Sequence, residues 1–351
     1  MKVAIFNDTR TKDKHFGCEI VMRNLEKLLR DSDLQPVWYW PVGRDWRKSL
    51  DQLPKRGDID AVIVNGEGSI HHSESRDRPD ILADVAKMAR NYLEVPAFLI
   101  NATLYQNSPR IYSKFKDFKK IYVRDAESLK ELEENGLEGE IVPDLTLSFP
   151  DHTPLIDRVG IGVTDSTIKH VNLDLKRACK QNNWAYCPMT VKIPKLPKIR
   201  DIAHPSKLAR KVKRYITEWR LERLDREILS ESPESPESFL SWLTSKEIII
   251  TGRYHTVTLC LLTKTPFVAV ESNTPKISSL LRDVFGSNHR VVSKVSDLPK
   301  QELHEFSYFT QDESKAIEEL LREASSKSHQ MMISFDTAIL QAKKVVEGCR
   351  D

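Results

Sequence analysis

The sequence lacks a framework of paired cysteines. Its five cysteines lie far apart, at Cys18, Cys179, Cys187, Cys260 and Cys349. No two of them have the CxxC spacing that is typical of a metal or redox site, and an odd number argues against a set of structural disulfides. The simplest interpretation is a protein of a reducing compartment.

Long apolar runs and an excess of charge of one sign are missing as well. No run approaches the roughly 20 apolar residues of a membrane-spanning helix, and the apolar start at 1–6 is too short for a signal peptide. The 54 basic and 51 acidic residues leave a net charge of +3, which argues against a nucleic-acid partner for the chain as a whole. We therefore expect a cytoplasmic protein that does not bind nucleic acid.

The length of 351 residues predicts two domains of ordinary size. A polar segment bracketed by prolines at 149–154 is the candidate boundary, so we expect an N-terminal domain over 1–150 and a C-terminal domain over 151–351. In both halves short apolar runs alternate with amphipathic segments, which is typical of Rossmann-like α/β units. The first loop has no GxGxxG, so a dinucleotide fingerprint is absent. C-terminal helices over 312–346 are expected to pack back on the first domain.

The clearest pattern is a strand–helix–strand–helix run over 247–285. Apolar, β-branched runs at 247–251 and 266–270 predict buried strands, and helices are predicted at 256–262 and 276–285. This order predicts parallel strands joined by a right-handed crossover, and in such sheets ligands bind beyond the carboxyl ends of the strands.

Arg253 and His255 follow the first of these strands, and Lys276 follows the second. We expect these three side chains to surround one crevice, beside helix N-termini that also favour anions. The prediction is a site for a small phosphorylated or carboxylated ligand. The alternative is that Arg253 is only solvated or ion-paired and that His255 is only hydrogen-bonded.

Polar residues also follow the predicted strands at 60–64 and 96–100. They are Asn65, Gly66, Glu67, Gly68, His71 and Asn101. The two glycines predict a turn that brings backbone close to a ligand, so that Glu67 or His71 meets a sugar hydroxyl; alternatively the glycines only form the turn. Neighbouring His71 and His72 point in different directions and have no third ligand at helical spacing, so no metal site is expected there.

Arg124 follows a predicted strand at 121–123 and precedes a predicted helix. A guanidinium can hold a carboxylate or phosphate with two parallel hydrogen bonds. The alternative is a structural ion pair of Arg124 with Asp125 or Glu127. His15, in the first loop, could face the cleft, but exposure to solvent is the favoured interpretation.

A basic segment at 192–224 contains eleven Lys or Arg and three Asp or Glu residues, with apolar residues at helical spacing. Such a segment can lie on an anionic membrane surface. The alternative is a solvated basic face whose apolar stripe packs on its own domain. Peripheral contact with the inner face of the cell membrane therefore stays open.

Together these motifs resemble the polysaccharide pyruvyl transferase family. The resemblance is carried by Gly252-Arg253-Tyr254-His255 with Lys276, by the glycine-rich segment after 60–64, and by the segment 124–128. Where the family often has a Gly-Asp pair, the first helix here begins at 15–19 with HFGCE. The resemblance implies two Rossmann-like domains facing across a cleft, as in type-B glycosyltransferases.

The resemblance also implies an activity and a set of roles. The enolpyruvyl group of phosphoenolpyruvate, the co-substrate, would be moved to a sugar of a cell-surface polysaccharide or of its precursor, a glycan or lipid-linked saccharide, to form a pyruvate ketal. His255, as general acid, and Arg253 would be catalytic, and Glu67 or Asp165 would be the base. The donor would be bound by Arg124, Thr251, Gly252, Arg253 and Lys276, and the acceptor by Asn65, Gly66, Glu67, Gly68, His71 and Asn101. No metal and no further cofactor is required by this chemistry.

Two other functions fit the same residues. A glycosyltransferase could hold the diphosphate of a nucleotide-sugar with Arg253 and Lys276, and its ribose with Glu271. A non-catalytic glycan-binding or assembly protein descended from such enzymes could have the same two-domain fold without the activity.

Overall fold

The computed structural model describes residues 1–10, 13–150, 157–191, 233–298 and 303–348, with a few single positions between 209 and 216. The basic segment at 192–224 lies outside these described residues apart from those single positions. Most of the expected boundary at 149–154 lies outside them as well.

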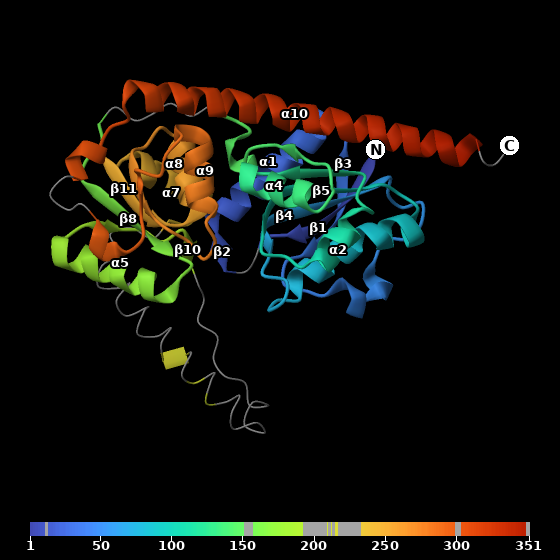
Figure 1. The fold of residues 1–351 in the computed structure, drawn as a ribbon, viewed down its shortest axis with the longest axis horizontal. Coiled ribbons are helices and arrows are strands. Elements are labelled where there is room, and N and C mark those ends of the chain that lie inside the picture. Colours follow the sequence, from blue (N-terminus) through green and yellow to red (C-terminus); the bar gives the residue numbers. More distant parts are fainter. Residues whose placement is uncertain are drawn as a thin grey trace.

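The first half of the chain forms a six-stranded parallel sheet (Figure 1). Its strands, in spatial order, are β3 (Gln35–Pro41), β1 (Lys2–Asp8), β4 (Ala61–His71), β5 (Ala97–Tyr105), β6 (Lys120–Val123) and β7 (Glu140–Ile141). The associated helices are α1 (Phe16–Asp31), α2 (Arg78–Met88), α3 (Pro109–Phe115) and α4 (Ala126–Glu134). Residues 3–6 of β1 and 61–64 of β4 are fully buried, as expected of central strands that are covered on both faces.

The second half forms a five-stranded sheet that is also parallel. Its strands, in spatial order, are β13 (Val291–Val292), β12 (Phe267–Val270), β11 (Ile248–Gly252), β8 (Ile161–Ser166) and β9 (Ala185–Tyr186), with helices α5 (Lys169–Asn182), α7 (Pro236–Thr244), α8 (Tyr254–Leu262) and α9 (Lys276–Phe285). The predicted strand–helix–strand–helix run is confirmed as β11, α8, β12 and α9, with β11 and β12 parallel.

The start of α1 joins the two halves. The ring of Phe16 stacks on that of Phe239 from α7, with 5.4 Å between the centroids. Just before α1, the short strand β2 (Lys14–His15) pairs antiparallel with β10 (Thr190–Val191). These contacts hold the beginning of a helix from the first half against α7 and β10 of the second half.

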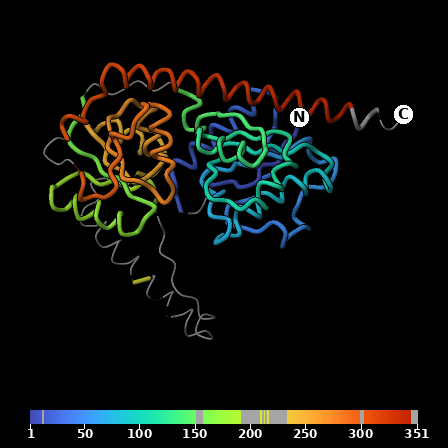
Figure 2. The backbone as a smooth tube through the Cα atoms, viewed as in Figure 1, coloured from blue at the N-terminus to red at the C-terminus, as the bar shows by residue number. Residues whose placement is uncertain are grey.

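A single long helix, α10 (Gln311–Gly348), runs along both halves (Figure 2). Ile317, Leu321 and Ala324 belong to the core around α8 and α9. Met332 and Phe335, further along, belong to the core of the first sheet. The helix therefore buries apolar surface on both sheets.

Two sequence expectations about strand ends are wrong. β4 does not end in a glycine-rich turn at residue 65: it continues to His71, with a register shift in its pairing to β5 between Glu67 and Ile70. Gly66 is needed because a Cβ there would lie 2.6 Å from the Cβ of Ala102 on the neighbouring strand. The sequence also predicts a strand at 158–163 followed by a loop at 164–167. In the structure β8 extends to Ser166, so this segment is largely strand.

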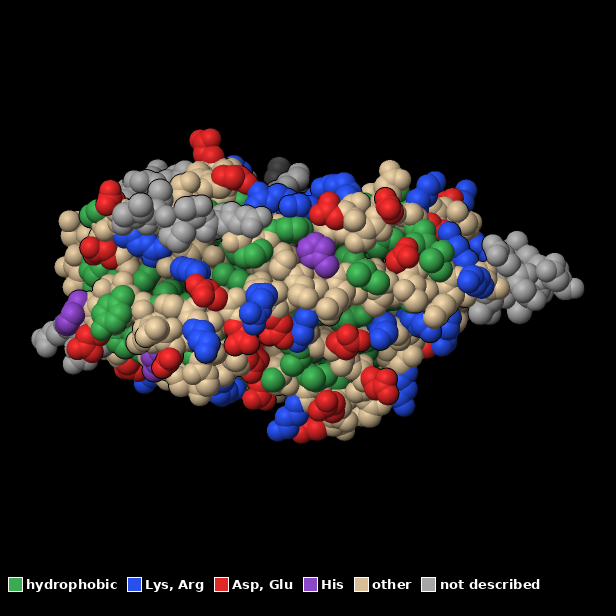
Figure 3. All heavy atoms as spheres, turned by 90° about the horizontal axis from the view of Figure 1, so that it is seen from above, with side chains coloured by type: hydrophobic (Ala, Val, Ile, Leu, Met, Phe, Trp, Pro, Cys, Tyr) green, Lys and Arg blue, Asp and Glu red, His purple; other side chains and the backbone are tan. Residues whose placement is uncertain are grey.

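The face that carries α10 shows acidic and basic side chains interspersed rather than gathered by sign (Figure 3). Among the helices that the structure describes, none is both long and apolar enough to cross a membrane.

Candidate active site

A cavity of about 350 Å³ lies between the two sheets. Residues of the first half that line it include Thr9, His15, Cys18, Glu67, Gly68, Ser69 and Arg124; those of the second half include Thr167, Thr190, Arg253, Tyr254, His255 and Lys276. The cavity is thus reached by side chains that follow strands of both sheets, as expected for parallel α/β folds. Of the predicted residues, Thr251, Gly252, Asn65, Gly66, His71 and Asn101 are not part of this lining.

Arg253 precedes α8 and is buried against Asp165 of β8. Its Nε donates to Asp165 Oδ2 at 2.9 Å, and its Nη2 donates to the same oxygen. The other oxygen, Oδ1, accepts the backbone N–H of Met189 at 2.9 Å. Asp165, a predicted base, is therefore occupied in holding Arg253, which also lines the cavity.

Thr251 and Gly252, at the end of β11, determine the backbone position of Arg253 and the spacing of β11 and β8. Thr251 Oγ1 accepts the backbone N–H of Arg253 at 3.0 Å and lies 2.6 Å from Thr164 Oγ1. A Cβ on Gly252 would lie 2.5 Å from the Cβ of Ser166, so glycine permits β11 to approach β8. Both residues position Arg253.

His255, in the first turn of α8, faces two carboxylates. Its Nε2 lies 4.0 Å from Glu67 Oε2 and 3.8 Å from Asp144 Oδ2. This nitrogen is buried and has no hydrogen-bond partner among the described residues. Burial lowers the pKa of His255, although both carboxylates act in the opposite direction. The neutral imidazole is therefore favoured until another negative charge arrives.

Lys276 begins α9 and brings an uncompensated charge to the cavity. It has no ion pair with an acid among the described residues, and its Nζ lies 5.9 Å from the ring centroid of Tyr254. Burial, with Arg124 and Arg253 nearby, lowers the pKa of Lys276 to about 8. An anion in the cavity would raise this pKa again and stabilise the charged form.

Arg124 is held at the cavity wall by its own partners. Nη1 donates to Asp144 Oδ2 at 2.6 Å, Nε donates to Thr103 Oγ1 at 3.0 Å, and the guanidinium lies 4.4 Å from the ring centroid of Tyr254. Arg124 is thus in a structural ion pair, but not with either of the two expected partners. Asp125 caps α4, and Glu127 pairs with Arg282. Asp144, twenty residues away, holds Arg124 instead.

Glu67 is the buried acid of the first half. Its backbone φ is +40°, uncommon for a residue with a Cβ, and such conformations gather at functional sites. Thr9 Oγ1 donates to Oε1, Asn65 Nδ2 donates to Oε1 at 2.8 Å, and Cys18 Sγ donates to Oε2 at 3.2 Å. Asn65 therefore orients Glu67, and Asn101 Nδ2 in turn lies 3.4 Å from Asn65 Oδ1.

His71 lies apart from this group. Its ring contacts the guanidinium of Arg76, and burial together with that charge lowers the pKa of His71 to about 3.

Cys18 lines the cavity although the sequence did not reveal it as a site residue, and His15 lines it as in the less favoured of its two interpretations. His15 is only partly exposed and lines the cavity, so its expected exposure to solvent is wrong. Its Nδ1 caps α1 by accepting the Cys18 N–H at 3.2 Å, and its ring meets that of His255 edge to face, 5.4 Å between centroids. The sequence feature that could have indicated this contact is the glycine at position 17. In the structure a Cβ on Gly17 would lie 2.4 Å from the Cβ of His255, so the start of α1 fits closely against α8.

A family model described as polysaccharide pyruvyl transferase matches residues 15–274. No curated protein matches the chain. Among solved structures, UDP-GlcNAc 2-epimerase from Methanocaldococcus jannaschii, in complex with UDP-GlcNAc and UDP, is similar at 14% identity and a TM-score of 0.52, over 96% of this chain and 99% of that one. A putative UDP-N-acetylglucosamine 2-epimerase from Listeria monocytogenes is similar at 10% identity and a TM-score of 0.52, over 97% and 96%.

At such low identity these structures show the fold alone. With the two parallel sheets, they confirm the predicted α/β fold of the type-B glycosyltransferase kind.

Proposed function

Because this chain belongs to the polysaccharide pyruvyl transferase family, we propose that it moves the enolpyruvyl group of phosphoenolpyruvate to a sugar and forms a pyruvate ketal. The family is one of transferase enzymes, so the chain is a transferase. The observation that carries the proposal is that the Lys276 ammonium and Nε2 of His255 lie in one cavity and that neither has an ion-pair or hydrogen-bond partner among the residues that the structure describes. One group attracts an anion and the other can move a proton.

The donor would be held by Lys276 and Arg253. Asp165 fixes the guanidinium of Arg253 through Nε and Nη2, which would leave Nη1 to bind a carboxylate or phosphate oxygen of the donor. Arg124, whose charge is balanced by Asp144, would form the wall against which the donor lies. Thr251 and Gly252 would contribute by placing Arg253.

His255 would move the proton that starts the reaction. In the protonated form it gives a proton to the methylene carbon, the C=C bond opens, and positive charge develops on the carbon that carries the phosphate. A sugar hydroxyl adds to that carbon and loses its proton, and the C–O bond to phosphate breaks. A second hydroxyl of the sugar closes the ketal. Of the two hydroxyl protons, one replaces the proton given by His255 and the other leaves with inorganic phosphate.

Charge explains how a buried histidine becomes an acid. Burial favours the neutral form of His255, but a bound phosphoenolpyruvate brings several negative charges next to the ring and raises its pKa. Glu67, 4.0 Å from Nε2, is the proposed base for the hydroxyl, since Asp165 is engaged by Arg253. Gly68 would line the acceptor's path beside Lys276, and Asn65 and Asn101 would support Glu67.

The acceptor would be a glycan or lipid-linked saccharide of a cell-surface polysaccharide. Peripheral contact of 192–224 with the inner face of the cell membrane belongs to this proposal, and its test is flotation of the full chain with anionic liposomes. Full-chain protein that stays at the bottom of the gradient would remove the membrane contact.

Transfer from a nucleotide-sugar is the rival function. Its expected ribose ligand, Glu271, accepts the N–H groups of Ser272 at 2.8 Å and Ser278 at 3.2 Å, so both carboxylate oxygens already have partners. This engagement favours the pyruvyl donor.

Thermal unfolding of the full chain with each donor tests the proposal. We expect phosphoenolpyruvate to raise the melting temperature and a panel of nucleotide-sugars to leave it unchanged, because a ligand stabilises only the state that binds it. Stabilisation by the nucleotide-sugars alone would favour the rival, and stabilisation by neither would favour a glycan-binding protein. With an active acceptor, His255→Ala should reduce phosphate release by roughly 10²–10⁴-fold. Undiminished turnover would reject the role of His255.

A further inference from the structure

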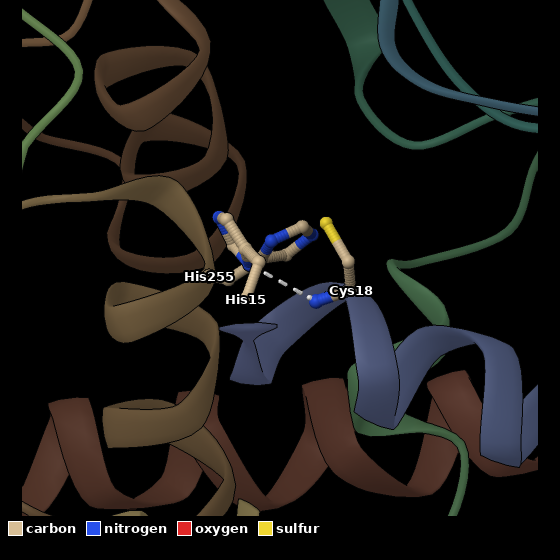
Figure 4. A group of neighbouring side chains, drawn as sticks. All are labelled: His15, Cys18 and His255. Atoms are coloured by element: carbon tan, nitrogen blue, oxygen red, sulfur yellow. Dashed lines mark hydrogen bonds between the residues drawn. The ribbon is translucent and has the colours of Figure 1, made fainter. Parts of the chain in front are cut away.

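Three side chains that are good ligands for transition metals meet at one wall of the cavity (Figure 4). His15 and Cys18 come from the start of α1, and His255 comes from α8. One ligand atom of each residue lies within 4.8 Å of the others. Tetrahedral coordination at about 2.0–2.3 Å places ligand atoms somewhat closer than this, so small side-chain rotations are enough to close the group on an ion.

A second observation points to a ligand at the same place. Nε2 of His255 is buried and has no hydrogen-bond partner in the described part of the chain, which is costly for a polar atom unless something binds it. Glu67 Oε2 lies 4.0 Å from this nitrogen and accepts the Cys18 thiol at 3.2 Å. A carboxylate oxygen of Glu67 therefore lies near both the unpartnered Nε2 of His255 and the sulfur of Cys18.

We propose that His15, Cys18 and His255, with Glu67 as a fourth ligand, bind a divalent thiophilic cation of the Zn²⁺ class. Thiolate and imidazole select such ions over Mg²⁺ or Ca²⁺, which prefer oxygen. On binding, the S–H bond of Cys18 breaks, its proton passes to solvent, and the sulfur bonds to the metal; nothing is oxidised or reduced.

The charges around the group permit this. The cations nearest to it include Arg253 and Arg124, which are paired with Asp165 and Asp144. An ion of charge +2 that displaces one proton from Cys18 adds a single positive charge to the site, and with the thiolate and the Glu67 carboxylate it forms a neutral group. Lys276 then remains as the uncompensated cation of the cavity.

The four ligands are not equivalent. A neutral imidazole has one lone pair, and His15 already uses Nδ1 to accept the Cys18 N–H that caps α1. Binding a metal through His15 therefore costs the cap hydrogen bond, whereas Nε2 of His255 gives up nothing. Removal of Cys18 or His255 should weaken metal binding more than removal of His15.

Metal binding would also inhibit the transfer reaction, a consequence that rests on the proposed function. An ion on Nε2 of His255 takes the lone pair that would carry the proton to the donor. Zn²⁺ would then act as a reversible inhibitor whose effect a chelator removes.

Absorption spectra of the full chain with Co²⁺ test the site without any need for activity. A thiolate ligand gives a charge-transfer band in the near ultraviolet, and tetrahedral coordination gives intense visible bands. We expect both in the unmodified protein, with Zn²⁺ displacing Co²⁺. Cys18→Ala should abolish the charge-transfer band. Cys179→Ala, at a buried cysteine of α5, is the matched control and should keep it.

The outcomes separate the site from the function. No charge-transfer band, or a band that survives Cys18→Ala in a variant with normal circular dichroism, would overturn the site. Its loss in Cys179→Ala would place the metal elsewhere and overturn it too. The site stands with the bands present whether or not phosphate release occurs. If release is measurable and saturating Zn²⁺ leaves it unchanged, the inhibitory consequence is overturned.

Discussion

At the scale of single residues, Lys276 has the charge that the rest of the cavity leaves unbalanced. Arg253 is neutralised by Asp165 and Arg124 by Asp144, but the ammonium of Lys276 has no acid partner among the described residues. Its pKa of about 8 reflects the cost of that isolation. A lysine kept in this state is more useful for binding an anion than for stabilising the fold.

Lys276→Met should therefore weaken binding of phosphoenolpyruvate more than it changes stability. A charge-assisted hydrogen bond contributes about 1.5–3 kcal/mol, so KM for the donor should rise by roughly 10–100-fold. In the unmodified protein Lys276 is charged below a pH of about 8 and neutral above it, so KM should rise as the pH passes that value. Steady-state phosphate release from pH 6 to 9.5 measures both effects.

Exposed Lys87 of α2 supplies the control: Lys87→Met should leave KM and its pH dependence unchanged. A donor KM in Lys276→Met that matches the unmodified protein at every pH would show that the ammonium does not bind the donor.

The sequence could predict the site residues that directly follow strands. It could not predict the partners that folding brings to them from distant parts of the chain. Arg253, His255 and Lys276 stand directly after predicted strands, so the strand–helix pattern alone places them at one edge of the sheet. All three line the cavity. The partner of Arg124 could not be found in this way, since Asp144 lies twenty residues further along and approaches only in the folded sheet. Cys18 was counted as one scattered cysteine, although folding brings it beside Glu67.

At the scale of secondary-structure elements, the site depends on how closely α1 approaches α8. Gly17→Ala tests this approach. Alanine is favoured over glycine within a helix by about 1 kcal/mol, but its Cβ would lie 2.4 Å from the Cβ of His255, which has no flexible end to move. We expect the overlap to dominate, with a net loss of about 1–3 kcal/mol in unfolding free energy and reduced turnover as His255 is displaced. Urea unfolding and phosphate release measure the two effects.

Gly68→Ala is the matched control for stability. Its Cβ would lie 3.6 Å from Lys276 Nζ, an ordinary contact distance, so its unfolding free energy should stay close to that of the unmodified protein. Equal stability of Gly17→Ala and Gly68→Ala would mean that the start of α1 is not held against His255.

Elements were predictable where apolar runs end at clear breaks. The predicted helix at 276–285 has the observed bounds of α9, because proline precedes it and glycine follows it. The sequence predicts an end of this strand at residue 64, because two glycines normally signal a turn, whereas β4 continues to His71. In the structure Gly66 instead allows close packing on Ala102, and the positive φ falls on Glu67. Tertiary packing, invisible to local patterns, decides this segment.

At the scale of the whole molecule, the cavity exists because two separate sheets are held in one arrangement. The start of α1 contributes to this, and so does α10, which packs on the core of the second sheet near Leu321 and on that of the first near Phe335. Phe335 is fully buried, and its ring stacks on Phe98 of β5 with centroids 4.2 Å apart. The aromatic contact ties the far end of a C-terminal helix to a central strand.

Phe335→Ala should lower the free energy of unfolding by about 3–5 kcal/mol, because it removes a large buried ring and leaves a cavity. Ile333→Ala, two residues earlier on the same helix, is the control: Ile333 is 64% exposed, so its truncation should change stability by less than about 0.5 kcal/mol. Urea unfolding measures both, and donor KM measured well below the transition shows whether the loosened helix also alters the cavity. Since α10 has apolar residues on both sheets, KM should rise in Phe335→Ala and not in Ile333→Ala. An unfolding loss without any change in KM would mean that α1 alone sets the spacing of the sheets.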